Sequence, residues 1–461
     1  VGSEMCIRDR TRAARKICVR SRAKRKPFAT VRASSMSQRR FSNEVWSSEA
    51  PRLGTRLACF RRRRCTVGHM SQLKQEYRAL MDRLDHHAVS MPKPEDQRAL
   101  EGWRELLELM YTPEEAAVAS RMPRMPTSLH RLAQRFDMPE AELKEKLEPL
   151  CDKGLVMDLV SPKTGRTKYL LAPPVVGFFE FSMMRAHDMF DKLAVAKAMD
   201  AYMHGDDTFA KEVFGNDTVV GRAMVHEDVL SQGIPDVLDW ERTTQLINDA
   251  DQIAVSHCYC RHKAEHLGKA CEVPQEICLS LNGGADFVVR RGFGRKIDKE
   301  QALGIVTKAR KLGLVQIADN VKNEPAYVCN CCACCCGQLS AINDFGLKAV
   351  NPSGFEPSYH VEDCKGCSRC SRACPVAAIS MRPARSGTQR KNELRAEFDS
   401  ELCIGCGVCA TTCKQDAITM ERREKPSHVP ENTVERVVRQ MVERGRLADL
   451  LFDESESRGA A

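Results

Sequence analysis

Two short cysteine runs near the C-terminal end constrain this chain more than any other feature. The first run reads C-x2-C-x2-C-x3-C and is followed by Pro375, and the second repeats the spacing thirty-nine residues later. The flanking residues also align, CKGCSRCSRACPVAAISM against CIGCGVCATTCKQDAITM. The runs consist of Cys364, Cys367, Cys370 and Cys374, then Cys403, Cys406, Cys409 and Cys413. Because the spacing occurs twice, it is a strong signal for bound metal.

The spacing meets the requirements of a cubane iron–sulfur cluster. Four thiolates must converge on one small object, three from a tight loop and the fourth from elsewhere. Gly366, Gly405 and Gly407 would relieve the backbone where it wraps around a cluster. Pro375 suits a chain that turns away after the fourth ligand. Paired zinc knuckles are the rival interpretation, but zinc explains neither four cysteines per run nor the three-residue gap.

These motifs resemble the bacterial two-cluster ferredoxin domain. The resemblance implies that the fourth cysteine of each run ligates the other cluster. One [4Fe–4S] cluster would then be held by Cys364, Cys367, Cys370 and Cys413, and the second by Cys403, Cys406, Cys409 and Cys374. The sequence departs from the family pattern at Lys414, which replaces a second proline. It also carries a basic insertion at 382–395, which predicts either a docking loop or a longer hairpin.

The net charge of +9 is concentrated at one end of the 461-residue chain. Residues 1–69 hold 19 of the 71 basic and 4 of the 62 acidic side chains, so the remainder carries 52 and 58, a net of −6. This mildly acidic body gives no global argument for nucleic-acid binding. There is no apolar run long enough for a membrane span. Eighteen of the 23 cysteines fall between 258 and 413, which favours metal binding over disulfides and predicts a cytoplasmic protein.

The first 69 residues are expected to contribute nothing to the fold. Residues 1–10 look like translated adapter sequence and are excluded. Residues 11–69 are rich in arginine and have no acidic residue before Glu44. Spurious translation of upstream DNA is the favoured interpretation, with Met70 as the true start. An organelle transit peptide, and hence a location in an organelle matrix, is the alternative, and a nucleic-acid-binding arm is a weaker third.

Residues 70–172 have the element order of a winged helix-turn-helix. Three helices are predicted first, at 71–85, near 97–110, and after a cap formed by Thr112 and Pro113. Two more helices are predicted at 127–136, with Thr127 as its cap, and at 140–153. A hairpin is predicted at 155–172. The would-be recognition helix at 140–153 carries a net charge of −2, which would repel phosphates. Protein docking or a structural role is therefore favoured over DNA binding, and nucleic acid is not an expected partner.

The whole chain is predicted to be an α+β multidomain protein. The front and central regions, 70–172 and 173–345, should be mostly helical, the ferredoxin-like domain should span 346–425, and a helix and tail should follow at 426–461. In the central region, Asp298 should cap a helix that runs through Leu312. The glycines nearby do not form a dinucleotide-binding motif, and no phosphate-binding loop is present.

The central region carries a second concentration of cysteines. Ten thiols fall within 79 residues, six of them in the run CNCCACCC that ends at Gly337. They are Cys258, Cys260, Cys271, Cys278, Cys329, Cys331, Cys332, Cys334, Cys335 and Cys336. Ten inert buried thiols would be an unusual use of a reactive residue. We therefore expect metal ligation, with iron–sulfur favoured over zinc and at least one further cluster.

Several groupings of these ten thiols are open. The quartet Cys258, Cys260, Cys271 and Cys278 could hold one cubane. Along an extended 329–336 segment, alternation would place 329, 331 and 335 on one face and 332, 334 and 336 on the other. Two sites could draw on both segments, or one site could use part of each. His262 and His266 could share a metal on a helix, although a solvated helix face is the usual place for such a pair.

Residues 70–425 as a whole resemble a bacterial group of 4Fe–4S dicluster-containing proteins. The matching features are the winged-helix-like front, CxCRHKAEH, CNCCxCCCG and the ferredoxin tail. The resemblance implies nothing about a substrate. The predicted clusters favour an electron carrier that relays single electrons through two [4Fe–4S] clusters and a central cluster to or from a partner oxidoreductase. One alternative is a redox enzyme with substrate at an open central iron. Another is an iron–sulfur DNA-binding regulator.

Overall fold

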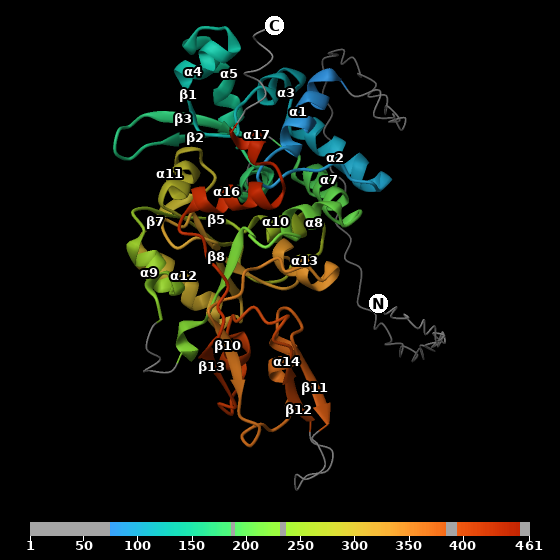
Figure 1. Cartoon of the computed structure of the whole chain (residues 1–461), viewed down its shortest axis with the longest axis vertical. Helices are drawn as coiled ribbons and strands as arrows, with labels where there is room; N and C mark the ends of the chain where they lie inside the picture. The colour runs from blue at the N-terminus through green and yellow to red at the C-terminus, as the bar shows by residue number, and fades with distance from the viewer. Residues whose placement is uncertain (1–73, 186–189, 231–236, 384–393, 452–461) are drawn as a thin grey trace, which may run out of the picture. The chain divides into compact units, whose positions relative to one another are not determined.

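The computed structural model describes residues 74–185, 190–230, 237–383 and 394–451. The predictions for residues 1–69, for most of the basic insertion and for the C-terminal tail fall outside these ranges. The described chain mixes helices with four separate sheets (Figure 1). Within these ranges, none of the helices combines the length and apolar character needed to cross a membrane.

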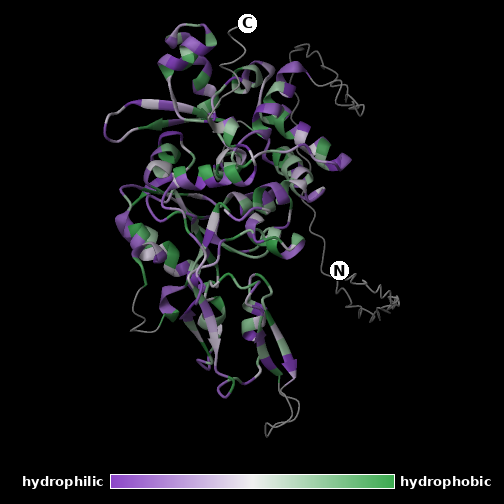
Figure 2. Ribbon diagram, in the orientation of Figure 1, coloured by the Kyte–Doolittle hydropathy of each residue, from purple (hydrophilic) through white to green (hydrophobic). Residues whose placement is uncertain are grey.

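The front region begins with three helices, α1 (Gln75–Asp85), α2 (Gln97–Met110) and α3 (Pro113–Ser120). Helix α1 lies within the predicted range 71–85, and the apolar residues that it buries are Tyr77, Leu80, Met81 and Leu84. Helix α3 starts with a capping box in which the Thr112 side chain accepts from the Glu115 amide and the Glu115 carboxylate accepts from the Thr112 amide. Figure 2 shows polar and apolar residues mixed along these helices, as expected when one face of each is buried.

A small sheet and two helices follow. They are β1 (Thr127–Ser128), α4 (Leu129–Phe136), α5 (Glu140–Asp152), β2 (Val156–Val160) and β3 (Thr167–Leu171). The strands pair antiparallel in the order β1-β3-β2. The predicted cap Thr127 is wrong by one residue, because Thr127 pairs with Tyr169 and the Ser128 side chain accepts from the Arg131 amide. This element order agrees with the winged-helix expectation, which stays a prediction.

The central region contains a six-stranded antiparallel sheet in the order β4-β8-β9-β6-β5-β7. Its strands are β4 (Gly221–Met224), β5 (Ile253–His257), β6 (Glu276–Leu281), β7 (Arg295–Ile297), β8 (Val315–Asp319) and β9 (Tyr327–Cys331). The central region has more helical than strand residues, but its sheet was not predicted. Most of these strands are short and largely buried, and periodicity alone does not distinguish such runs from pieces of buried helix.

Helical segments precede, separate and follow these strands along the chain. They are η2 (Pro174–Phe178), α6 (Phe179–Met184), α7 (Lys192–His204), α8 (Thr208–Phe214), η3 (Glu227–Val229), η4 (Asp239–Glu241), α9 (Thr243–Asp249), α10 (Tyr259–His266), α11 (Asn282–Arg290), α12 (Lys299–Lys311) and α13 (Gly337–Phe345). The predicted cap at Asp298 is confirmed, since it forms a capping box with Gln301 at the start of α12. Strands β9, β6 and β5 are neighbours, so the sheet brings the segments that carry the central cysteines together.

The C-terminal part consists of two β-ribbons, each associated with a short helix. Its elements are β10 (Phe355–Tyr359), α14 (Arg369–Ala373), β11 (Ile379–Pro383), β12 (Leu394–Phe398), α15 (Val408–Thr412) and β13 (Ile418–Arg422). Strand β10 pairs with β13 and β11 with β12, as the orange and red strands of Figure 1 show. The basic insertion thus lies between two paired strands. Helices α16 (Thr433–Glu443) and α17 (Leu447–Leu451) end the described chain.

Candidate metal centres

The eight cysteines of the doubled motif line two separate cavities. One cavity is lined by Cys364, Cys367, Cys370 and Cys413. The other is lined by Cys374, Cys403, Cys406 and Cys409. Each cavity therefore takes three thiols from one run and the fourth from the other, which is the grouping that the interlocked assignment requires.

The backbone around both cavities is shaped for thiolate ligands. Gly366 and Gly405 adopt φ of +65° and +69°, and backbone amides donate to sulfur from Gly366 to Cys364 at 3.4 Å and from Ala378 to Cys374 at 3.2 Å. Burial raises the pKa of the Cys406 thiol to about 12. A thiolate at that position therefore needs a bound cation. The four thiols in each cavity, the cavities themselves and the backbone amides that donate to sulfur all fit bound iron–sulfur clusters.

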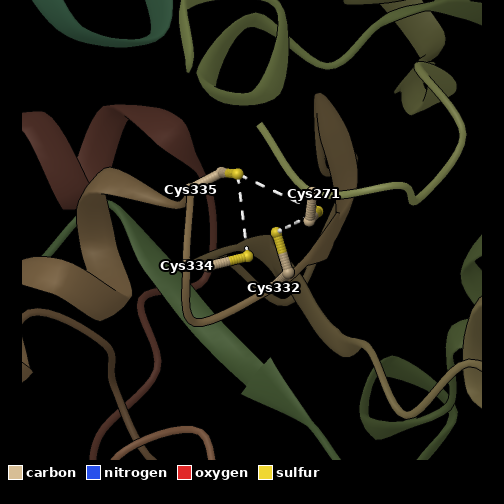
Figure 3. Close-up of side chains that lie close together, drawn as sticks. All are labelled: Cys271, Cys332, Cys334 and Cys335. Carbon is tan, nitrogen blue, oxygen red and sulfur yellow. Dashed lines mark hydrogen bonds between the residues drawn. The ribbon is translucent and has the colours of Figure 1, made fainter. Parts of the chain in front are cut away.

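The ten central thiols fall into two groups. The Sγ atoms of one quartet all lie within 4.8 Å of one another (Figure 3), and its members are Cys271, Cys332, Cys334 and Cys335. The other six line a large cavity, and they are Cys258, Cys260, Cys278, Cys329, Cys331 and Cys336. Cys332 and Cys335 of the quartet lie at the wall of the same cavity, so the two groups are adjacent. We call these groups the thiol quartet and the thiol hexad. Both groups draw on both sequence segments, which was one of the open predictions.

Two of the sequence-based groupings are wrong. Cys271 does not join Cys258, Cys260 and Cys278, because it lies 3.6 Å from Cys332 across the two segments. Alternation along 329–336 also fails, because strand β9 ends at Cys331 and the chain turns. The Cys336 amide donates to the Cys332 carbonyl at 3.1 Å, and this turn places Cys336 with the hexad and Cys335 with the quartet.

The hexad thiols form a connected series. Neighbouring thiols are close enough to shift one another's pKa, in the order Cys258, Cys260, Cys336, Cys331, Cys329 and Cys278. They line a cavity of about 200 Å³, whereas each cavity of the doubled motif measures about 20 Å³. The central cavity is thus ten times larger than a site with four cysteine ligands. The rest of its lining is mainly apolar and includes Phe181, Phe209 and Phe287.

Three polar residues that the sequence reasoning missed also belong to the central sites. Burial raises the pKa of Glu180, which lines the hexad cavity, to about 8, so this carboxyl is mostly protonated at neutral pH. Lys263 lines the same cavity, and burial lowers its pKa. Arg261 is fully buried and donates to Cys332 Sγ at 3.3 Å. Arg261 and Lys263 lie within the CxCRHK motif, which could have indicated their role; nothing in the sequence singles out Glu180.

His262 and His266 on α10 do not both point into solvent, which is the usual arrangement of such a pair on a helix. His262 is buried, and its Nδ1 lies 2.7 Å from the Met183 carbonyl oxygen. Its Nε2 lies 3.2 Å from Nε2 of His266. Among the residues with described positions, no third donor forms a metal-binding group with them. We therefore assign them no ligand role.

The comparisons with known proteins concern the doubled motif. Residues 363–417 match the family model of the 4Fe-4S dicluster domain. This segment is therefore similar to 4Fe-4S dicluster domains, and we call it the dicluster domain. The matched residues include all eight cysteines of the two interlocked cavities. No curated protein matches the chain.

The dicluster domain is joined to the central region next to its second cavity. The Cys406 carbonyl accepts from the His226 amide at 3.0 Å, and the Gly405 carbonyl accepts from the Ser353 hydroxyl at 2.6 Å. Arg423 donates to the Cys403 carbonyl at 2.7 Å. These bonds hold the loop that carries three of the second cavity's thiols from several directions, whereas Cys367 of the first cavity is exposed.

Proposed function

We propose that this protein is an iron–sulfur electron carrier. Two [4Fe–4S] clusters would be held by the interlocked quartets of the dicluster domain, and a further cluster by the thiol hexad. Bound clusters of this type supply one-electron transfer. A partner oxidoreductase would give or take the electrons, since the sequence has no flavin or nicotinamide motif. The wealth of free thiols fits a reducing compartment, and we propose the cytoplasm.

The observation that carries this proposal is the short connection between the hexad and the dicluster domain. Helix α13 begins directly after Cys336, and the side-chain amide of Asn343 donates to the Pro375 carbonyl at 3.0 Å. Pro375 follows Cys374, a thiol of the second cavity. Seven helical residues rise about 10 Å. One helix therefore spans from the hexad to the edge of the second cavity.

Burial suggests where electrons enter. In the first quartet Cys367 is exposed, whereas Cys406 and Cys409 of the second quartet are buried. Residues Cys331, Cys336 and Cys406 belong to one continuous apolar core. A partner would therefore meet the first cluster, the second cluster would lie between, and the hexad would form the inner end. The basic insertion after β11 is our candidate for the docking loop.

The front region fits a structural role better than DNA binding. Arg291 at the end of α11 donates to Glu148 at 2.7 Å and to Asp152 at 2.8 Å, and both acidic residues lie on α5. The helix that would enter a DNA groove is thus acidic and paired with the central region. We propose that this winged-helix-like unit docks within the protein, and the DNA-binding regulator is the less favoured alternative.

Freeze-quench EPR with a reduced flavodoxin as electron donor tests the relay. A protein donor cannot enter the hexad cavity, so the central cluster should be reduced only through the dicluster domain. Cys406→Ala should slow reduction of the central cluster at least tenfold, while Cys151→Ala, in the front core, should leave the rate unchanged. Equal rates in the Cys406 variant and the parent would contradict the relay.

The size of the central cavity favours a second candidate, a redox enzyme with substrate beside the hexad. About 200 Å³ exceeds what the cysteine quartets of the dicluster domain enclose, and Glu180 and Lys263 add polar groups to an apolar lining. Carbon monoxide and cyanide are suitable small probes of an open iron. A shift of the central EPR signal by either would favour the enzyme, and an unchanged signal would favour the carrier.

A further inference from the structure

The thiol quartet is too compact for an iron–sulfur cluster. Cys271 Sγ lies 3.6 Å from Cys332 Sγ and 3.9 Å from Cys335 Sγ, and Cys334 Sγ lies 3.7 Å from Cys335 Sγ, as the dashed lines in Figure 3 mark. None of these cysteines is in a disulfide. The four sulfur atoms point toward one another from the loop before β6 and from the turn after β9.

These distances match a single tetrahedral ion. A metal ion bound by four thiolates at about 2.3 Å places the sulfur atoms about 3.8 Å apart. In a cubane each thiolate binds a different iron, so the sulfur atoms stand farther apart. The dicluster domain provides an internal comparison: across the described ranges, only the central quartet brings four ligand atoms within 4.8 Å of one another. The quartet therefore differs in kind from the cluster sites.

The surroundings of the quartet suit a dianionic metal–tetrathiolate centre. Arg261 donates to Cys332 Sγ at 3.3 Å, and its other terminal nitrogen donates to the Pro274 carbonyl at 3.0 Å. This buried guanidinium supplies positive charge next to the sulfur atoms and fixes the loop that carries Cys271. Cys334 is exposed, so an ion can reach the site from solvent.

We propose that Cys271, Cys332, Cys334 and Cys335 bind one tetrahedral divalent ion, zinc or iron(II), separately from the hexad. Tetrahedral S₄ sites select these metals. The ion would link the loop that carries Cys271 to the turn after β9, which carries its other three ligands. This inference does not rest on electron transfer, since the quartet would bind its ion whether the hexad serves a carrier or an enzyme.

The test uses the full chain purified without oxygen, with zinc, iron and acid-labile sulfide measured per chain. We expect one zinc, or one iron beyond those matched by sulfide, with X-ray absorption at that metal's edge showing four sulfur atoms at about 2.3 Å. Cys271→Ser/Cys334→Ser should lower the occupancy of this ion at least tenfold and leave iron and sulfide otherwise unchanged. The matched control, Cys278→Ser in the hexad, should lower iron and sulfide together and retain the ion.

A second measurement covers the case in which the double variant does not fold. Unaltered protein produced with cobalt(II) should show the visible absorption bands of a tetrahedral cobalt tetrathiolate. Joint loss of iron and sulfide from the double variant would overturn the proposal in favour of a cluster. The proposal would also be overturned if the protein contained no zinc, had no iron in excess of its sulfide and took up no cobalt. That result would show that the quartet holds no metal.

Discussion

Gly405 occupies a backbone position that no other residue type can fill without distortion. Its φ is +69°, and an added Cβ would lie 2.2 Å from the Phe355 carbonyl oxygen and 2.3 Å from Ser353 Oγ. The residue stands between Cys403 and Cys406, so a shift there displaces two thiols of the second cavity. We predict that Gly405→Ala loses about four irons per chain, one cubane's content, because the second cluster does not assemble.

Gly165 provides the control for this substitution. Its φ is +65°, but a Cβ there would meet nothing within 4 Å. Gly165→Ala should cost only the left-handed backbone strain, about 1–2 kcal/mol, and should keep all of its iron. Iron analysis of the two purified variants makes the comparison. Full iron content in Gly405→Ala would show that the contacts at Phe355 and Ser353 do not shape the site.

The interlocked ligand assignment makes a prediction about pairs of substitutions. Cys374 and Cys403 line the same cavity, so Cys374→Ala/Cys403→Ala should lose one cluster, about four irons. Cys374 and Cys364 line different cavities, so Cys374→Ala/Cys364→Ala should lose both, about eight irons. Each run binding its own cluster would give the opposite order of iron losses, so iron content per chain decides between the assignments.

At the residue scale, sequence spacing was a good guide to one site and a poor guide to the other. The eight cysteines of the dicluster domain lie in a repeated local motif, and their cavities follow from it. In the central region the turn after Cys331 breaks the side-chain alternation, so Cys335 joins Cys332 and Cys334 while Cys336 joins Cys329 and Cys331, the reverse of what alternation predicts. That turn depends on tertiary contacts such as Arg261 with Cys332, which lie 71 residues apart.

Among the elements, the hairpin β2–β3 is tied to helix α11 by a buried ion pair. Asp158 on β2 accepts from Arg290 and Arg291, each at 2.7 Å, and only 6% of its side chain is exposed. We predict that Asp158→Asn destabilises the protein by about 2–3 kcal/mol, because two guanidinium groups lose their buried partner. The denaturant midpoint and hydrogen exchange in β2 and β3 measure the effect.

Asp152→Asn is the matched control, since Asp152 pairs with the same Arg291 but 54% of its side chain is exposed. Solvent screens that pair, so the substitution should cost less than about 1 kcal/mol. An equally large loss in both variants would contradict a special role for the buried pair.

The pH dependence of the Asp158 contribution follows from its pKa. Burial acts to raise the pKa, but hydrogen bonds from Arg291 and Arg290 outweigh burial and hold the pKa below its usual value. The contribution is therefore fully present above the unfolded pKa of about 3.9 and is lost as pH falls through the lower folded pKa. The stability difference between parent and Asp158→Asn should stay constant from about pH 8 to about pH 5.

Elements with local signals were predictable, and those without them were not. Residues that are close together in the sequence predict the caps at Thr112 and Asp298 and the hairpin around Gly165, and the structure contains all three features. The central sheet was missed because its strands are short, mostly buried and in part paired across long sequence separations. Gly221, for example, pairs with Asp319, and no local sequence pattern indicates that register.

For the molecule as a whole, the sheet and helix α13 place three groups of thiols in series. Cys331 and Cys336 of the hexad share one apolar core with Cys406 of the second quartet, and Cys409 of that quartet shares another with Cys370 of the first. The fourth group, the compact thiol quartet, lies beside this series. We therefore expect the protein to bind more metal than the dicluster domain alone can hold.

The number of bound clusters is measured by iron and acid-labile sulfide per chain on anaerobically purified protein. We expect at least about twelve irons with a matching amount of sulfide, from two clusters in the dicluster domain and one at the hexad, plus one ion of zinc or iron without sulfide. About eight irons, with the six hexad thiols free to react with an alkylating reagent after denaturation in chelator-free buffer, would contradict a third cluster at the hexad.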